Sequence, residues 1–197
     1  MSHFVRQPLV VVGISGSPSS RSKSRTLLTI ALDALRDEGS DTRTIDLSTL
    51  SADALLARGT APDVADAIAQ VAAAHVVVAS TPVYRATFSG LLKTFFDLLP
   101  MRALNGKVAL GIATGASPGH EAVLDLGLRP LFASLDAVVA PHFVFATDAA
   151  FTNGTPDASL LTRTRQAARR TFELSDAIAS ARRSDGTNQP SLVDSSA

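Results

Sequence analysis

Cysteine and tryptophan are absent from the 197 residues, and tyrosine occurs once. Without cysteine the chain has no disulfide, no thiolate nucleophile and no cysteine-ligated metal or cluster. An excess of charge of one sign is also lacking, because lysine plus arginine and aspartate plus glutamate both number 18. Bulk electrostatics therefore indicate neither nucleic acid nor a membrane surface as a partner. No apolar run approaches about 20 residues, so we expect no membrane-spanning segment.

The N-terminal residues lack the pattern of a secretion signal. The apolar run 9–14 is too short and too rich in β-branched residues for a signal-peptide core, and no small-residue cleavage site follows it. The length fits one domain, for which about 100–200 residues is usual. We therefore expect a single soluble, cytoplasmic domain over residues 1–183. Residues 184–197 are rich in serine, aspartate and other polar residues and predict a disordered tail.

The most informative stretch is residues 10–25, VVVGISGSPSSRSKSR. Its β-branched start predicts a strand buried on both faces, which turns through a small-residue loop into a helix from about Thr26. Residues 16–25 contain five serines, two arginines and one lysine. Hydroxyls, free backbone N–H groups and a helix N-terminus together form a site for a small dianion such as a terminal phosphate.

Two known phosphate motifs do not describe this loop. Gly13 and Gly16 lack the G-x-G-x-x-G spacing, and no Gly-Lys-Ser/Thr sequence closes a Walker A loop. The alternative is an ordinary strand-to-helix turn with a serine N-cap. Since one cap needs only one serine, the density of hydroxyls favours the phosphate site.

Strands and helices alternate along the rest of the chain. We expect strands at 10–14, 42–47, 75–80, 107–113 and 137–145, and helices at 26–38, 63–73, 89–99, 120–135 and 157–181. Gly127 and Pro130 should make the helix over 120–135 irregular. The alternation predicts a parallel sheet with helices on both faces, whose ligands bind beyond the carboxyl ends of the strands.

Three loops should meet at that end of the sheet, namely 15–24, 81–85 and 114–119. They are rich in glycine, serine, threonine and proline and have few titratable side chains. Their hydrogen-bonding groups are therefore mostly backbone and hydroxyl. This composition suits a cofactor that supplies its own chemistry better than it suits acid–base catalysis.

Motifs in these three loops together resemble the NAD(P)H-dependent FMN reductase family. They are Gly16-Ser17-Pro18 with Ser22 and Ser24, Thr81-Pro82-Val83-Tyr84 with the run SGLLKTFFDLLP over 89–100, and Ala113-Thr114-Gly115. Within the family, the sequence is most similar to the alkanesulfonate- and methanesulfonate-linked reductases of two-component monooxygenase systems. The resemblance covers about residues 9–145. It implies a flavodoxin-like α/β fold with a doubly wound, five-stranded parallel sheet in the order 2-1-3-4-5.

The resemblance also implies a function. The enzyme would reduce FMN with NADPH or NADH and supply the reduced flavin to a partner monooxygenase. The loop with Ser17, Ser22 and Ser24 would hold the FMN phosphate, the second loop would line the ribityl chain and ring, and the third would lie along the ring edge. The candidate cofactor-binding residues are Ser15, Ser17, Ser19, Arg21, Ser22, Ser24, Arg25, Pro82, Val83, Tyr84, Arg85, Thr114, Gly115 and Ala116.

Several charged or aromatic residues have two interpretations each. Arg21 and Arg25 are candidates for the FMN phosphate and Arg85 for a phosphate of the nicotinamide cofactor. For each of them, a surface arginine without a ligand is the default interpretation. Tyr84 offers an aromatic face or hydroxyl, or is a packed loop tyrosine. His120 approaches the flavin or nicotinamide, or simply begins a helix. Direct hydride transfer needs no catalytic side chain, and no metal is expected. Without tryptophan, the flavin ring should stay accessible to a second planar ligand.

One position departs from the family pattern. In the sulfonate-linked reductases the fourth helix has a bulge with a polar aromatic residue, and the matching position here is Leu126. This substitution leaves the partner and the flavin exchange open. Two alternative functions remain: a reductase that keeps FMN bound and reduces quinones, azo dyes or metal oxyanions, and a flavodoxin-type electron carrier. Carriers usually dock through an acidic surface, so the balanced charge disfavours the second.

The predicted helix 89–99 is apolar nearly all round. A helix packed on a sheet needs only one apolar stripe, so the surplus predicts a second copy of the same helix as its partner. We therefore expect a homodimer or homotetramer, with Phe96 in the interface and Tyr84 and Arg85 near the neighbouring chain. The apolar set is Phe88, Leu91, Leu92, Phe95, Phe96, Leu98 and Leu99.

Overall fold

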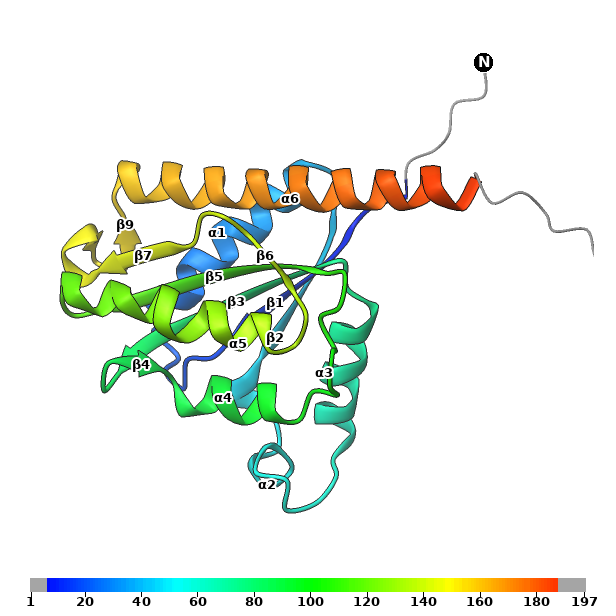
Figure 1. Cartoon of the computed structure of the whole chain (residues 1–197). Coiled ribbons are helices and arrows are strands. Elements are labelled where there is room, and N and C mark those ends of the chain that lie inside the picture. The colour runs from blue at the N-terminus through cyan, green and yellow to red at the C-terminus, as the bar shows by residue number, and fades with distance from the viewer. Residues whose placement is uncertain (1–6, 188–197) are drawn as a thin grey trace, which may run out of the picture.

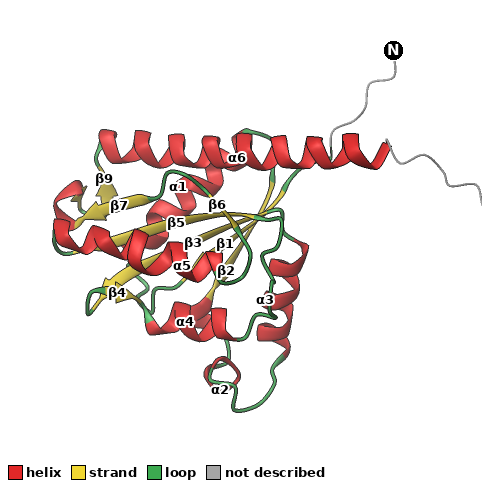
Figure 2. Cartoon of the chain, viewed as in Figure 1, coloured by secondary structure: helices red, strands yellow, loops and turns green. Residues whose placement is uncertain are grey.

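The structure is a computed structural model that describes residues 7–187 (Figures 1 and 2). Its centre is a parallel sheet in the order β2-β1-β3-β5-β6, with β7 also paired to β5. The parallel strands are β1 (Val10–Ser15), β2 (Asp41–Asp46), β3 (Val76–Tyr84), β5 (Val108–Gly115), β6 (Val138–Val139) and β7 (Val144–Thr147). Because β6 and β7 together form the fifth main strand, the predicted order 2-1-3-4-5 is confirmed.

Helices cover both faces of this sheet (Figure 1). On one face lie α1 (Lys23–Asp37) and α6 (Ala158–Thr187), and on the other α3 (Pro62–Ala73), α4 (Gly90–Asp97) and α5 (Arg129–Ala133). Val11 packs in the first core and its neighbour Val12 in the second. Successive side chains of a strand point to opposite faces, so two cores require the continuous apolar runs seen in the sequence.

The first helix starts earlier than predicted. Ser22 is its N-cap and accepts a hydrogen bond from the backbone N–H of Arg25 at 3.2 Å. Helix α1 therefore begins at Lys23 rather than at Thr26. It ends at Asp37, two residues before Gly39, whose φ of +88° suits the left-handed residue after a helix.

The second predicted loop is partly strand. β3 continues to Tyr84 instead of ending at residue 80, and it pairs with β4 (Thr87–Phe88) as a hairpin. The two turn residues, Arg85 and Ala86, have φ values of 52° and 64°. Two-residue hairpin turns of this kind usually contain glycine or asparagine. Neither occurs here, so the sequence carried no hairpin signal.

The predicted strand 137–145 is interrupted. Four residues, 140–143, separate β6 from β7, whereas only two residues separate their partners on β5. Pro141 has no N–H to donate, which favours a break at this edge. The Phe143 ring fills the space above Gly111, where an added Cβ would lie 2.5 Å from the ring.

The predicted helix over 120–135 is irregular, as Gly127 and Pro130 indicated. It consists of a 3-10 turn η2 (Pro118–Glu121), a π-helical turn η3 (Leu124–Leu128) and α5. Leu126 lies in the middle of η3 with 81% of its surface exposed. Gly127 packs against Phe88, because an added Cβ would lie 3.1 Å from that ring. The bulge therefore forms without an aromatic residue at position 126.

Helix α4 is buried more completely than predicted. Phe96 is 2% exposed in the single chain, and its ring contacts Phe95 at 6.2 Å and Phe132 at 5.8 Å between centroids. The prediction that Phe96 lies in a dimer interface is therefore wrong. The sheet and α5 already cover the helix on two sides. Most of its apolar surplus belongs to the core of the chain itself.

The C-terminal third also differs from prediction. The expected loop through Asn153 and Gly154 is a hairpin of β8 (Phe151–Thr152) and β9 (Thr155–Pro156), preceded by η4 (Asp148–Ala150). Helix α6 continues to Thr187, so the predicted tail begins within a helix, and residues 188–197 lie outside the described part. Between β2 and α3 lie the short elements η1 (Leu47–Thr49) and α2 (Ala52–Leu55). No helix in residues 7–187 is long and apolar enough to cross a membrane.

Candidate functional site

The three predicted loops meet at one edge of the sheet. Ser15 at the end of β1 pairs in register with Ser80 on β3. Further along, Pro82 on β3 pairs with Thr114 on β5. The carboxyl ends of the three central strands are therefore neighbours, which is the position where open α/β sheets bind ligands.

Hydroxyl groups shape the first loop from within. Ser17 Oγ accepts a hydrogen bond from the N–H of Ser19, and Ser19 Oγ accepts one from the N–H of Arg21, both at 3.2 Å. Ser22 Oγ caps α1 and lies 3.0 Å from Ser24 Oγ. Ser15, Ser17 and Ser24 are buried. These hydrogen bonds fix the backbone of the loop, and the serine hydroxyls keep acceptor or donor capacity for a ligand.

Backbone donors in the same loop remain free. Five N–H groups have no acceptor within the described part of the chain, those of Ser17, Ser20, Ser22, Lys23 and Ser24. The last two belong to the first turn of α1, where the helix dipole is positive. Free N–H groups at a helix N-terminus bind phosphate, so the residues present fit the terminal phosphate of FMN.

The second loop and α4 brace the first loop. The N–H of Gly16 donates to the carbonyl of Ser80 at 2.8 Å, and Ser89 Oγ donates to the carbonyl of Gly16 at 2.5 Å. Ser89 also caps α4 and donates its N–H to Thr81 Oγ at 2.9 Å. An added Cβ at Gly16 would lie 2.8 Å from Leu92. Sequence reasoning missed this role of Ser89, although serine before an apolar run is an N-cap signal.

Three cationic side chains surround the first loop, and two of them are paired. Arg25 donates from Nε to Ser15 Oγ at 3.2 Å and lies 2.7 Å from Asp46. Lys23 Nζ lies 2.8 Å from Asp148. Within the described residues, no carboxylate pairs with Arg21, which is exposed. The loop therefore has one cation without an acidic partner.

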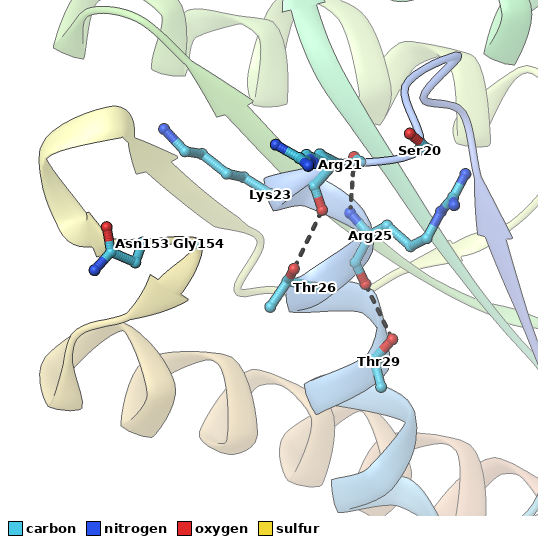
Figure 3. A pocket seen from close by; sticks show the side chains of 9 residues that line it. Ser20, Arg21, Lys23, Arg25, Thr26, Thr29, Asn153 and Gly154 are labelled. Carbon is cyan, nitrogen blue, oxygen red and sulfur yellow. Dashed lines mark hydrogen bonds between the residues drawn. The ribbon is translucent and has the colours of Figure 1, made fainter.

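A cavity of about 640 Å³ lies between the start of α1 and the β8–β9 hairpin (Figure 3). Figure 3 shows Lys23 extending toward the hairpin and Arg25 turned away from it. Sequence reasoning missed the hairpin wall, although Asn-Gly between short strands is a hairpin signal. The lining residues are Ser20, Arg21, Ser22, Lys23, Arg25, Thr26, Thr29, Asn153 and Gly154.

The second loop offers one buried surface and one exposed tip. Val83 is 8% exposed, whereas Tyr84 is 48% exposed. Arg85 is exposed at the tip of the hairpin. This arrangement leaves the tyrosine ring accessible from solvent, beside the buried ends of β3 and β5.

The third loop is built around a glycine that a histidine covers. Thr114 and Gly115 are buried at the end of β5, and Ala116 is exposed. An added Cβ at Gly115 would lie 2.8 Å from His120 Cβ, so the missing side chain admits His120 rather than opening a surface. His120 Nδ1 is buried and has no hydrogen-bond partner among the described residues. The three loops contain no carboxylate, so they form a binding surface rather than an acid–base pair.

Comparison with known proteins gives consistent matches. The family model for NADPH-dependent FMN reductase matches residues 9–152. An FMN reductase (NADPH) of Pseudomonas putida KT2440 is 42% identical over 156 residues, which cover 78% of this chain and 79% of the relative. An FMN reductase (NADPH) of Escherichia coli K12 is 38% identical over 70% of this chain and 73% of its own. The NADH-dependent FMN reductase SfnE of Pseudomonas putida is 36% identical, covering 85% and 92%.

Solved structures agree with these relatives. The apo form of an NADH:FMN oxidoreductase (EmoB) superposes with a TM-score of 0.77 and 33% identity, covering 83% of this chain and 88% of that one. A flavodoxin of Streptococcus pneumoniae has a TM-score of 0.59 at 17% identity, and this likeness confirms the flavodoxin-like fold alone. The predicted family is thus confirmed by sequence and by structure. The chain belongs to the NADPH-dependent FMN reductase family.

Proposed function

We propose that this protein catalyses the reduction of FMN by NADPH or NADH and supplies the reduced flavin to a partner monooxygenase. The observation that carries the proposal is the first loop, with five backbone N–H groups that have no acceptor in the described chain. Curated relatives named FMN reductase support it, some named for NADPH and others for NADH.

Each of the three loops binds a different part of FMN. Ser17, Ser22 and Ser24 hold the FMN phosphate together with the free N–H groups around them. The neighbouring loops take the rest of the molecule, with Pro82–Tyr84 along the ribityl chain and ring and Thr114–Ala116 along the ring edge. When bound, FMN supplies the acceptor for a hydride from the nicotinamide.

The protein contributes position rather than proton transfer. The site loops have no carboxylate, and the Nδ1 atom of His120 is buried against Gly115. The chain therefore has to stack two planar rings in one orientation and exclude water between them. The exposed Tyr84 and the lack of tryptophan leave the outer ring face open to the second ligand.

We further propose that the protein works in the cytoplasm as a homodimer or homotetramer. Leu126 is 81% exposed and Tyr84 is 48% exposed. The two residues lie on elements in contact, because Gly127 packs on Phe88 of the hairpin that carries Tyr84. An exposed apolar surface beside a binding site is typical of an interaction surface.

Colour and nucleotide consumption test this function. We expect a nearly colourless purified protein that oxidises NADPH or NADH only when FMN is added. A yellow protein that turns over quinones or azo compounds would instead be a reductase with resident FMN. A yellow protein without turnover would be an electron carrier. Absence of NADPH and NADH oxidation at saturating FMN contradicts the proposal.

A further inference from the structure

The cavity beside α1 is larger than an FMN phosphate requires. Its volume of about 640 Å³ lies within the range of about 300–1,000 Å³ that is common for small-molecule sites. It begins at Ser20–Ser22 and continues along α1 to Thr29 and the β8–β9 hairpin (Figure 3). The FMN ring is expected beside β3 and β5. The end of the cavity at Asn153 and Gly154 is therefore not explained by FMN.

This end of the cavity has a fixed wall. Lys23 Nζ pairs with Asp148 at 2.8 Å and lies 5.4 Å from the centre of the Phe151 ring. Asp148 lies in η4, which leads into the hairpin, and Phe151 is the first residue of β8 in the hairpin itself. The lysine thus ties the hairpin to the first turn of α1, and its charge is already neutralised there.

The remaining charge of the cavity suits a phosphate ester. Arg25 is turned away and paired with Asp46, whereas Arg21 has no acidic partner among residues 7–187. Among the described residues, no carboxylate lines the cavity. A guanidinium offers paired N–H donors that match phosphate oxygens, so Arg21 is suited to a second phosphate group.

The ring site and the cavity are connected along β7. Gly115 at the end of β5 pairs in register with Thr147, and the next residue, Asp148, holds Lys23 in the cavity wall. A dinucleotide whose nicotinamide lies at this edge is longer than the flavin from its ring to its phosphate. Where the dinucleotide runs from this edge along β7 toward Asp148 and Lys23, its adenosine end reaches the phosphate loop or beyond. NADPH has a phosphate monoester at that end, and NADH does not.

We propose that this cavity receives the 2′-phosphate and the adjoining ribose of NADPH, and that Arg21 selects NADPH over NADH. The proposal rests on the proposed FMN reductase activity, for which it names the preferred reductant. Neutral Asn153 and Gly154 face the sugar side, and Arg21 contacts the phosphate. The FMN phosphate binds the serines and the free N–H groups of the first loop, as proposed above.

Steady-state kinetics with two variants test the assignment. Arg21→Gln removes the charge, and Arg165→Gln removes the same charge from an exposed position on α6 outside the cavity. The measured quantity is the ratio of kcat/KM for NADPH to that for NADH. We expect Arg21→Gln to lower this ratio about tenfold, as for the loss of one charge-assisted hydrogen bond, and Arg165→Gln to leave it within twofold. An unchanged ratio in Arg21→Gln overturns the proposal.

Two further measurements distinguish the 2′-phosphate from other ligands of Arg21. If Arg21 binds the FMN phosphate, both nucleotides lose efficiency equally and FMN binding weakens, which overturns the proposal. Calorimetric titration of the full chain with adenosine 2′-monophosphate, adenosine 5′-monophosphate and inorganic phosphate gives a readout without turnover. We expect tighter binding of the 2′-phosphate than of the other two, and loss of that difference in Arg21→Gln. Equal binding of all three indicates a general anion site and contradicts the inference. If neither nucleotide reduces FMN, the proposed function fails. The titration still shows whether the cavity prefers an adenosine 2′-phosphate.

Asn153→Asp provides a second test at the opposite wall. Aspartate tolerates the left-handed conformation of this residue, whose φ is 51°, so the hairpin should be retained. The added carboxylate should repel the 2′-phosphate and lower the NADPH to NADH ratio. A ratio equal to that of the natural protein would show that the hairpin wall does not lie near the 2′-phosphate, which contradicts the proposal.

Discussion

Ser22 serves both the fold and the proposed phosphate site. Its hydroxyl caps α1 at 3.2 Å and contacts Ser24 Oγ at 3.0 Å. Its own N–H is among the free donors of the loop. A residue with two roles needs a test in which loss of stability and loss of binding are measured separately.

We expect Ser22→Ala to weaken FMN binding by about 1–2 kcal/mol and riboflavin binding much less, because only FMN has a charged phosphate to accept the hydrogen bond. Equilibrium titration with both flavins measures the difference. Asp157→Ala is the control, since Asp157 accepts the N–H of Leu160 at 2.7 Å at the start of α6. It should lower stability and leave both flavins unaffected. Equal losses for FMN and riboflavin in Ser22→Ala would remove the serine from the phosphate site.

Substitution of His120 tests whether the reaction needs a side chain that acts as a general acid or base. Its Nδ1 is buried without a partner in the described chain, and the ring packs over Gly115. We expect His120→Ala to lower the single-turnover rate of flavin reduction by far less than the ~10²–10⁴-fold typical of a lost general acid. Stopped-flow absorbance at saturating NADPH and FMN measures this rate. A collapse of that size with flavin still bound would mean that His120 transfers a proton.

At the scale of elements, Lys107 links the end of α3 to the start of β5. Its ammonium donates to the carbonyls of Ala72 at 2.7 Å and Ala74 at 2.8 Å, which lie at the C-terminal end of α3. Burial, and secondarily the charge of Arg182, lowers the pKa of Lys107 below its ordinary value. Partial burial of the ammonium is unfavourable for the charged form. In return, the ammonium satisfies carbonyls at a helix end, where the helix dipole favours a cation.

Lys107→Met should lower the free energy of unfolding by about 2 kcal/mol, because both carbonyls lose a charged donor. Urea unfolding measures the change, and Lys93→Met is the control, since Lys93 pairs with Asp97 on an exposed face of α4. The pH dependence has a definite sign. The lowered pKa means that the unfolded chain binds more protons, so the natural protein gains stability as pH rises from the folded pKa toward the unfolded one. A Lys107→Met variant as stable as the control would contradict the capping role.

Elements whose signal lies in one short stretch of sequence were predicted correctly. The apolar runs at Val10 and Val76, the loop with Ser22 and the irregular helix at Gly127 were all predicted from short stretches. The β3–β4 hairpin was missed because Arg85 and Ala86 adopt left-handed φ values without glycine or asparagine. The C-terminal extension of α6 to Thr187 was missed because its polar composition resembles a tail.

The candidate site was predicted less completely than the fold. The first loop is one contiguous stretch, so its hydroxyls were visible in the sequence. The brace from Ser89 to Gly16 and the cavity wall at Asn153 join residues separated by 73 and by more than 100 positions, respectively. Contacts of that kind depend on sheet order and packing, which no local pattern encodes.

At the scale of the whole molecule, a homodimer would have to use a surface other than the one predicted from the sequence. Phe96 is buried in its own chain, so Phe96→Asp would unfold the protein rather than separate subunits. The exposed apolar residues beside the site are Tyr84 and Leu126. They lie on the hairpin and on the π-helical turn that pack together through Phe88 and Gly127. Two-fold dimers use the same patch on both chains, and this patch is next to the flavin loops.

We therefore expect sedimentation at micromolar protein to give at least a dimer. The Leu126→Glu variant should shift the monomer–dimer equilibrium toward the monomer. The glutamate places a charge in an apolar contact, where it has no partner and loses its hydration. Met101→Glu is the matched control, because Met101 is 89% exposed and lies outside the patch. If Tyr84 and Arg85 complete the site of the neighbouring chain, Leu126→Glu should also weaken FMN binding, whereas Met101→Glu should not. A natural protein that is monomeric and fully active would exclude this patch as a subunit interface.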